Sequence, residues 1–83
     1  MFIEKVEIKE ARKLIAAGRQ PYQYLTKNPH VLPIFGPRLE DPGERNRAKK
    51  EGRLAENVEA AQQIAKRFGT EVSMVSFLTD NLK

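Results

Sequence analysis

Proline is the residue that most constrains this chain, because four of its five prolines fall between residues 19 and 41. Proline lacks a backbone N–H and disfavours the helical conformation in the residue before it. A long helix is therefore excluded from residues 19–41, and this stretch is expected to be a connector. Within it, Pro21 suits the first turn of a short helix over 22–27, whereas Pro33 restricts the apolar segment 31–35 to an extended coil or an edge strand.

Apolar residues recur at helical spacing on both sides of this connector. The first such run predicts a helix over about 8–17, which Gly18 ends by supplying a left-handed backbone conformation. Residues 2–8 alternate imperfectly between apolar and charged side chains, so a short strand and the start of this helix both fit them. The N-terminal part of the chain is thus expected to contribute one helix to the core.

Asp41 and Pro42 form the clearest helix start in the sequence, because aspartate caps a helix and proline suits its first position. The helical pattern that follows is long, and Gly52 is expected to bend or break it. We therefore predict two separate helices in this part of the chain, over about 42–51 and 54–68.

The last apolar pattern favours one more helix, over about 71–81. Its residues Val72, Val75 and Leu78 are spaced at intervals of three. A chain of this length has room for one small core. Together the patterns predict one domain over residues 1–83 that is all-α, or mainly α with a short N-terminal strand.

The composition excludes several kinds of functional site. The chain has no cysteine, so disulfides, zinc fingers, iron–sulfur clusters and thiol catalysis are ruled out. His30 is the only histidine, and neither an acidic calcium loop nor a nucleophile–base pair is recognisable. We therefore expect no metal, no cofactor and no catalytic residue, and hence a protein that is not an enzyme.

The sequence also carries no signal for a membrane. No apolar run approaches the ~20 residues that span a bilayer, and the N-terminal residues lack the long apolar region of a signal peptide. The absence of cysteine fits a reducing compartment. We expect a cytoplasmic protein without a membrane partner.

The net charge of +4 favours acidic partners, nucleic acid first. The charge is concentrated between residues 43 and 53, where five basic side chains stand against two acidic ones, a net of +3. The basic residues of this run are Arg45, Arg47, Lys49, Lys50 and Arg53. They are candidate contacts for phosphates or for RNA, and a solvated helix face is the alternative explanation.

Residues 61–80 carry a spacing pattern that two closely packed helices need. A small residue at Ala65 lets the helices cross, Gly69 makes a left-handed turn, and Val75 points back between them. This stretch resembles the helix-turn-helix family of DNA-binding proteins over 20 of the 83 residues.

The resemblance implies that the second helix enters the major groove of DNA and that its outward residues meet base edges. The residues in those positions are Thr70, Glu71, Ser73, Ser76 and Phe77, with Lys66 and Arg67 placed to contact phosphates. The implied function is a small transcriptional regulator, of the kind found in bacteria and phages. It would act on DNA in preference to RNA, and a homodimer would suit it.

Two other functions remain open. A protein-binding adaptor or inhibitor would use the apolar segment 31–35 or the last predicted helix, where Met74 and Phe77 would be anchors if exposed. An RNA-binding protein would use residues 45–53. The exposure of Phe77 tests the DNA-binding hypothesis, because a buried Phe77 cannot face DNA.

Overall fold

The computed structural model describes residues 2–36 and 39–79, and its central feature is a three-stranded antiparallel sheet in the order β1-β5-β2. The elements in chain order are β1 (Phe2–Glu7), α1 (Ile8–Ala16), β2 (Pro21–Thr26), β3 (Ile34–Phe35), α2 (Pro42–Lys50), β4 (Leu54–Ala55), α3 (Val58–Arg67) and β5 (Val72–Thr79). Because β1 and β2 both run antiparallel to β5, they are parallel to each other, and α1 is the crossover that connects them.

The prediction of an all-α or mainly α fold is therefore wrong, and the error lies in two segments. The expected helix over 71–81 is β5 as far as Thr79, and its last residues lie outside the described part of the chain. The expected short helix over 22–27 is β2. Residues 2–7, which fitted two alternatives, form β1.

The helices begin and end where caps and glycines place them. Asp41 caps α2 by accepting a hydrogen bond from Gly43 N at 3.3 Å, and Pro42 occupies the first turn. After α2 the backbone turns at Gly52, which has a φ of 73° in the left-handed region. The break expected at Gly52 is thus present.

The helix predicted over 54–68 begins later, at Val58. Residues 54–55 form β4 instead, which pairs in parallel with β3 in a small second sheet. Asn57 then caps α3, because its Oδ1 accepts a hydrogen bond from Ala60 N at 2.8 Å. Pro33 precedes β3 directly, in keeping with the extended conformation expected of that segment.

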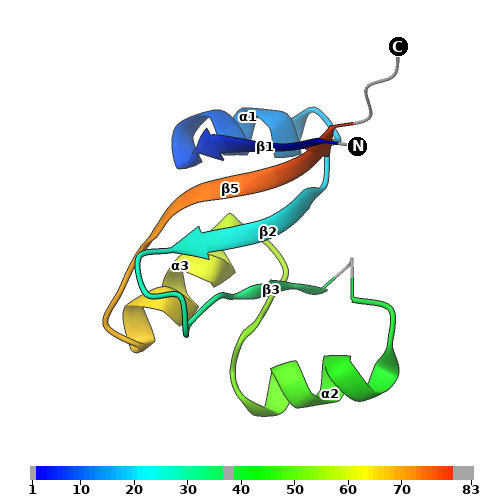
Figure 1. Cartoon of the computed structure of the whole chain (residues 1–83), viewed down its shortest axis with the longest axis vertical. Helices are drawn as coiled ribbons and strands as arrows, with labels where there is room; N and C mark the ends of the chain where they lie inside the picture. The colour runs from blue at the N-terminus through cyan, green and yellow to red at the C-terminus, as the bar shows by residue number, and fades with distance from the viewer. Residues whose placement is uncertain (1, 37–38, 80–83) are drawn as a thin grey trace.

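The core lies between one face of the three-stranded sheet and the helices α1 and α3, which cover that face (Figure 1). Its buried members are Ala11, Tyr24, Phe35, Ala55, Val58, Ala61, Ile64, Ala65, Val72, Val75 and Phe77. Alanines on α1 and α3 let both helices approach the sheet closely. Burying each larger aliphatic side chain contributes roughly 1.5–3 kcal/mol, so most of the stability of this small domain comes from this layer.

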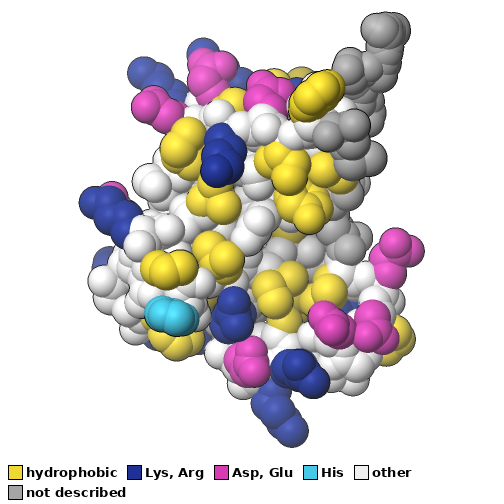
Figure 2. All heavy atoms as spheres, in the orientation of Figure 1, with side chains coloured by type: hydrophobic (Ala, Val, Ile, Leu, Met, Phe, Trp, Pro, Cys, Tyr) yellow, Lys and Arg dark blue, Asp and Glu magenta, His cyan; other side chains and the backbone are white. Residues whose placement is uncertain are grey.

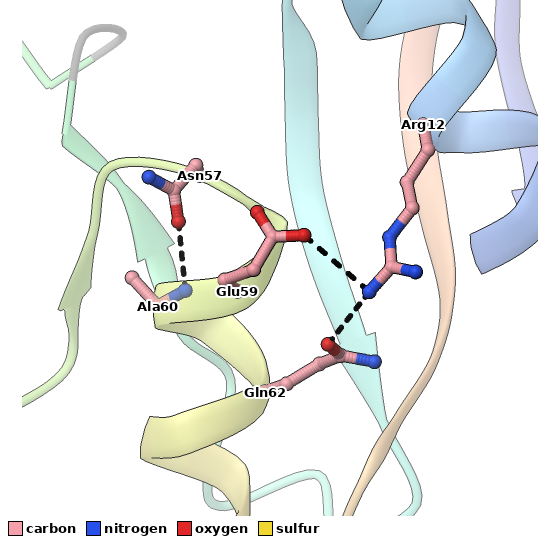
Figure 3. Close-up of polar contacts among 5 residues, drawn as sticks. All are labelled: Arg12, Asn57, Glu59, Ala60 and Gln62. Atoms are coloured by element: carbon pink, nitrogen blue, oxygen red, sulfur yellow. Dashed lines mark hydrogen bonds and ion pairs between the residues drawn. The ribbon is translucent and has the colours of Figure 1, made fainter.

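Arg12 joins the two covering helices at the surface (Figure 3). One of its guanidinium nitrogens, Nη2, lies 3.4 Å from Glu59 Oε2 and donates a hydrogen bond to Gln62 Oε1 at 3.0 Å. Both partners are on α3, whereas Arg12 is on α1. Arg12 and Glu59 are exposed and Gln62 is partly exposed, so the contact adds little to stability.

The other face of the sheet has no helix on it (Figure 1). Alternation along the strands places Ile3, Leu25, Met74 and Leu78 on this helix-free face. Figure 2 shows hydrophobic side chains reaching the surface there. None of the helices in residues 2–36 and 39–79 is long and apolar enough to cross a bilayer.

Candidate nucleic-acid interface

The second helix of the predicted helix-turn-helix is absent, because residues 72–79 form the strand β5. A recognition helix must present its outer face to DNA, but β5 is the central strand of a sheet. Phe77 is 0% exposed and Ser76 is 2% exposed, so neither side chain can meet a base edge. The prediction of a DNA-reading helix over 71–81 is therefore wrong.

The residues of that predicted site do not share one surface. Arg19 covers Phe77, with its guanidinium carbon 5.1 Å from the ring centre, and Ser76 Oγ donates to Gln23 O at 3.2 Å. Thr70 and Glu71 lie in the turn before β5, where Glu71 pairs with Lys27 at 3.3 Å.

Of the other members of the set, Ser73 is exposed on β5. Lys66 and Arg67 are exposed in the last turn of α3. Only these last two remain candidates for phosphate contact.

The basic run predicted to bind phosphate lies on α2 and on the turn that follows it. The helix buries only Ala48, so nearly all of its surface faces solvent. Arg47, Lys49 and Lys50 are exposed in its last turn, where positive charges complement the partial negative charge of the helix C-terminus. Figure 2 shows Lys and Arg side chains projecting at the lower end of the molecule, where Figure 1 places α2.

Two members of the basic run have structural partners instead. Arg45 Nη1 donates to Gly36 O, and Nη2 lies 3.8 Å from Glu56 Oε1. Arg53 Nη2 donates to Leu32 O at 2.9 Å, and Nη1 lies 3.5 Å from Glu51 Oε1. These arginines tie the segment 32–36 to the region around α2. Arg45 and Arg53 therefore act first as clamps, with their charge partly offset by a glutamate.

Arg67 brings a distant part of the sequence to the same place. Its Nη1 lies so near Gly52 that a Cβ atom built on that glycine would be 3.0 Å away. The side chain of Arg67, at the C-terminal end of α3, therefore reaches the turn that follows α2. We call Arg47, Lys49, Lys50 and Arg67 the α2 basic surface.

The charge of the α2 basic surface is not neutralised within the molecule. Among the residues that the structure describes, none of its four side chains forms an ion pair or hydrogen bond. The acidic neighbour in sequence, Glu51, pairs with Arg53. This arrangement leaves four positive groups available to an external anion.

A groove lies between β2 and the segment 32–35, and Arg53, which follows the turn at Gly52, is part of its lining. Its volume is about 430 Å³. It is lined by Tyr22, Gln23, Leu32, Pro33, Ile34, Phe35, Leu39 and Arg53, and we call it the β2–β3 groove. Figure 2 shows hydrophobic side chains at the surface between the sheet and α2.

The apolar segment 31–35, predicted to dock a protein partner, is divided between core and groove. Val31, Pro33 and Phe35 are buried. Leu32 and Ile34 are partly exposed and line the β2–β3 groove. Pro33 and Phe35 also line the groove although most of each side chain is buried, so Val31 is the one residue of this segment that does not contribute to it.

The sequence pattern indicates the basic run, and it shows Tyr22 as an aromatic residue that could stack on a base or pack in the core, but it reveals neither the bulge at Tyr22 nor the proximity of Arg67 to Gly52. Tyr22 lines the groove because β2 carries a bulge there: Pro21 pairs with Phe77 and Gln23 with Ser76, so Tyr22 is the extra residue. The predicted short helix concealed this strand. A turn at Gly52 was expected, but which residue would pack against it depends on tertiary structure.

No group of three or more histidine or acidic side chains suited to a metal ion occurs in residues 2–36 and 39–79. The surface that remains is one of positive charge beside an apolar groove, and its chemistry suits a polyanion that also has flat apolar parts. Comparisons with protein-family models, with curated proteins and with solved structures found no match to this chain.

Proposed function

We propose that this protein binds RNA through the α2 basic surface. The observation that carries the proposal is the approach of Arg67 to Gly52, which adds a basic group from α3 to those at the end of α2. Clusters of exposed arginine and lysine bind phosphates and release condensed counterions, which is the main source of affinity for nucleic acid. The net charge of +4 acts in the same direction.

RNA is favoured over duplex DNA by what lies around the basic groups. Proteins usually read duplex DNA by inserting a helix or a β-ribbon into the major groove. The helix-turn-helix that would have done so is replaced by β5, and α2 is a helix of only nine residues clamped to segment 32–36 through Arg45. Basic residues gathered at a surface beside an apolar groove match how proteins hold the backbone of single-stranded RNA.

The test is RNA affinity at several salt concentrations, measured by fluorescence anisotropy with a labelled single-stranded RNA. The variant carries Arg47→Gln, Lys49→Gln and Lys50→Gln together. We expect its affinity to fall at least tenfold at low salt. We also expect the slope of log affinity against log salt to become shallower by about 2, since each phosphate contact in a single strand contributes about 0.7.

A matched control removes the same number of positive charges elsewhere, by Lys9→Gln, Lys13→Gln and Lys27→Gln. We expect this control to retain most of the affinity and the salt slope of the wild type. Equal losses in both triple variants would show attraction by net charge alone and would contradict a defined surface. Absence of RNA binding by the wild type at low salt would overturn the proposal.

A further inference from the structure

The β2–β3 groove has the size and the walls of a site for one flat, partly apolar group. Its volume of about 430 Å³ lies within the range of roughly 300–1,000 Å³ that small-ligand sites occupy. Tyr22, which is 42% exposed, supplies an aromatic ring to the lining. Leu32, Ile34 and Leu39 supply aliphatic surface, and Gln23 supplies an amide that both donates and accepts hydrogen bonds.

We infer that this groove receives an unpaired base of the RNA whose phosphates lie on the α2 basic surface. This inference rests on the proposed function. Proteins that bind single strands stack bases on aromatic side chains while basic groups follow the backbone. An aromatic ring, aliphatic walls and a side-chain amide suit the faces and the edge of a nucleobase, and the groove is too open for a buried cofactor.

Arg53 connects the two halves of the site. It lines the groove, and it follows α2 directly across the turn at Gly52. Its hydrogen bond to Leu32 O fixes the wall of the groove relative to that turn, at which Arg67 also lies. A chain that places a base in the groove therefore has positive charge at its next phosphates. This charge favours a nucleic acid over an apolar peptide as the occupant.

The experiment compares Tyr22→Ala with Tyr22→Phe in binding to short oligoadenylate and to duplex RNA. Loss of one stacking residue weakens single-strand binding by roughly tenfold or more. We expect that loss for Tyr22→Ala with oligoadenylate, and near wild-type affinity for Tyr22→Phe, which keeps the ring. Duplex RNA hides its base faces, so neither variant should change its affinity.

Phe2→Ala is the control for exposed aromatic surface in general, because Phe2 is 68% exposed on β1 and does not line the groove. It should bind oligoadenylate as the wild type does. An oligonucleotide of abasic sites supplies the phosphates alone. The wild type and Tyr22→Ala should bind it equally, and more weakly than the wild type binds oligoadenylate.

The chain has two tyrosines and no tryptophan, so intrinsic emission gives a second readout. Stacking on Tyr22 should quench that emission in a Tyr24→Phe background. Salt-dependent RNA binding that needs the α2 basic surface but is unchanged by Tyr22→Ala would overturn the base site and leave the proposed function standing. Loss of affinity in the α2 triple variant equal to that in its control would overturn both. An apolar peptide that binds the groove more tightly than oligoadenylate would also overturn the base site.

Discussion

Tyr24 is the residue with the least satisfied side chain in the core. It is fully buried, its ring meets Phe35 edge to face with centres 5.7 Å apart, and its hydroxyl has no hydrogen-bond partner within residues 2–36 and 39–79. A buried hydroxyl without a partner loses its hydration and gains nothing in return. The ring stabilises the fold, whereas the hydroxyl opposes it.

Removing this hydroxyl should therefore stabilise the protein. We expect Tyr24→Phe to raise the free energy of unfolding by about 1 kcal/mol, because the desolvated hydroxyl disappears and the ring remains. Tyr24→Leu, which also lacks the hydroxyl but loses the ring contact with Phe35, should instead lower it. Urea unfolding measures both, and a Tyr24→Phe variant less stable than the wild type would show that the hydroxyl is bonded.

Tyr24 also makes the stability of the protein depend on pH in the alkaline range. Burial raises the pKa of Tyr24, and the nearby Glu59 raises it further. The pKa of Tyr24 in the folded protein exceeds the unfolded value of about 10, so above pH 10 the unfolded chain releases this proton more readily than the folded protein does. The free energy of unfolding is therefore unaffected by Tyr24 below pH 10 and falls above it. The wild type should lose up to about 1.4 kcal/mol per pH unit more than Tyr24→Phe in that range.

At the scale of elements, the sequence located helix ends better than it located strands. Gly18, Gly52 and Gly69 all have positive φ, and each ends a helical segment as their lack of a side chain led us to expect. These signals are local. A cap or a glycine acts on its own neighbours, so its effect can be predicted without knowledge of the rest of the fold.

The sequence pattern predicts a helix where β5 lies, because this strand has apolar residues on both of its faces. Val75 and Phe77 point to the core, whereas Met74 and Leu78 lie on the helix-free face. A strand with apolar residues on both faces loses its alternation and imitates the spacing of a helix. Its β-branched and aromatic residues were the available signal. Its partners β1 and β2 are far away in sequence, so their pairing leaves no local pattern.

The candidate site was predictable to the same degree. The basic run on α2 is contiguous in sequence and was found. Its meeting with Arg67, and the groove between β2 and segment 32–35, depend on how distant elements pack. The clamping roles of Arg45 and Arg53 depend on carbonyl groups of residues 32–36, which no sequence pattern reveals.

Substitution of Gly52 tests the contact between the Arg67 side chain and the turn that follows α2. Gly52→Ala and Gly69→Ala both place a side chain at a φ of 73° to 77°, so each should cost about 1–2 kcal/mol of folding free energy. Only at Gly52 does the new Cβ meet Arg67, whose flexible guanidinium can move aside. We expect similar urea midpoints for the two variants but weaker RNA binding, by a few-fold, for Gly52→Ala alone. Equal RNA affinities would contradict a role for Arg67 in the site.

For the molecule as a whole, charge protects the open edge of the sheet. β1 pairs only with β5 among the described strands, so its other edge is available to another chain. If two copies of β1 paired antiparallel about a twofold axis, each residue would stay on its own face of the sheet. The longest registers of this kind place Glu4 opposite Glu4 or Lys5 opposite Lys5. Like charges then lie directly opposite each other, which is unfavourable. This edge therefore disfavours self-association.

Lys5 has a second effect, on the helix-free face. Cross-strand neighbours form a polar row of Lys5, Ser76 and Gln23, and this row separates Ile3 and Leu78 from Met74 and Leu25. Each apolar group is small by itself, whereas contiguous apolar patches above a few hundred Å² are typical of interfaces. The polar row thus keeps the exposed apolar surface divided.

Lys5→Leu joins the two apolar groups and removes a charge from the edge at the same time. We expect this variant to self-associate as its concentration rises, while the wild type stays monomeric, as measured by size-exclusion chromatography with light scattering. Lys9→Leu is the matched control, since it makes the same chemical change on the exposed surface of α1. Self-association of both variants would implicate added apolar surface anywhere on the molecule. A Lys5→Leu variant that stays monomeric would show that the sheet face is too polar or too curved to pair even without its lysine.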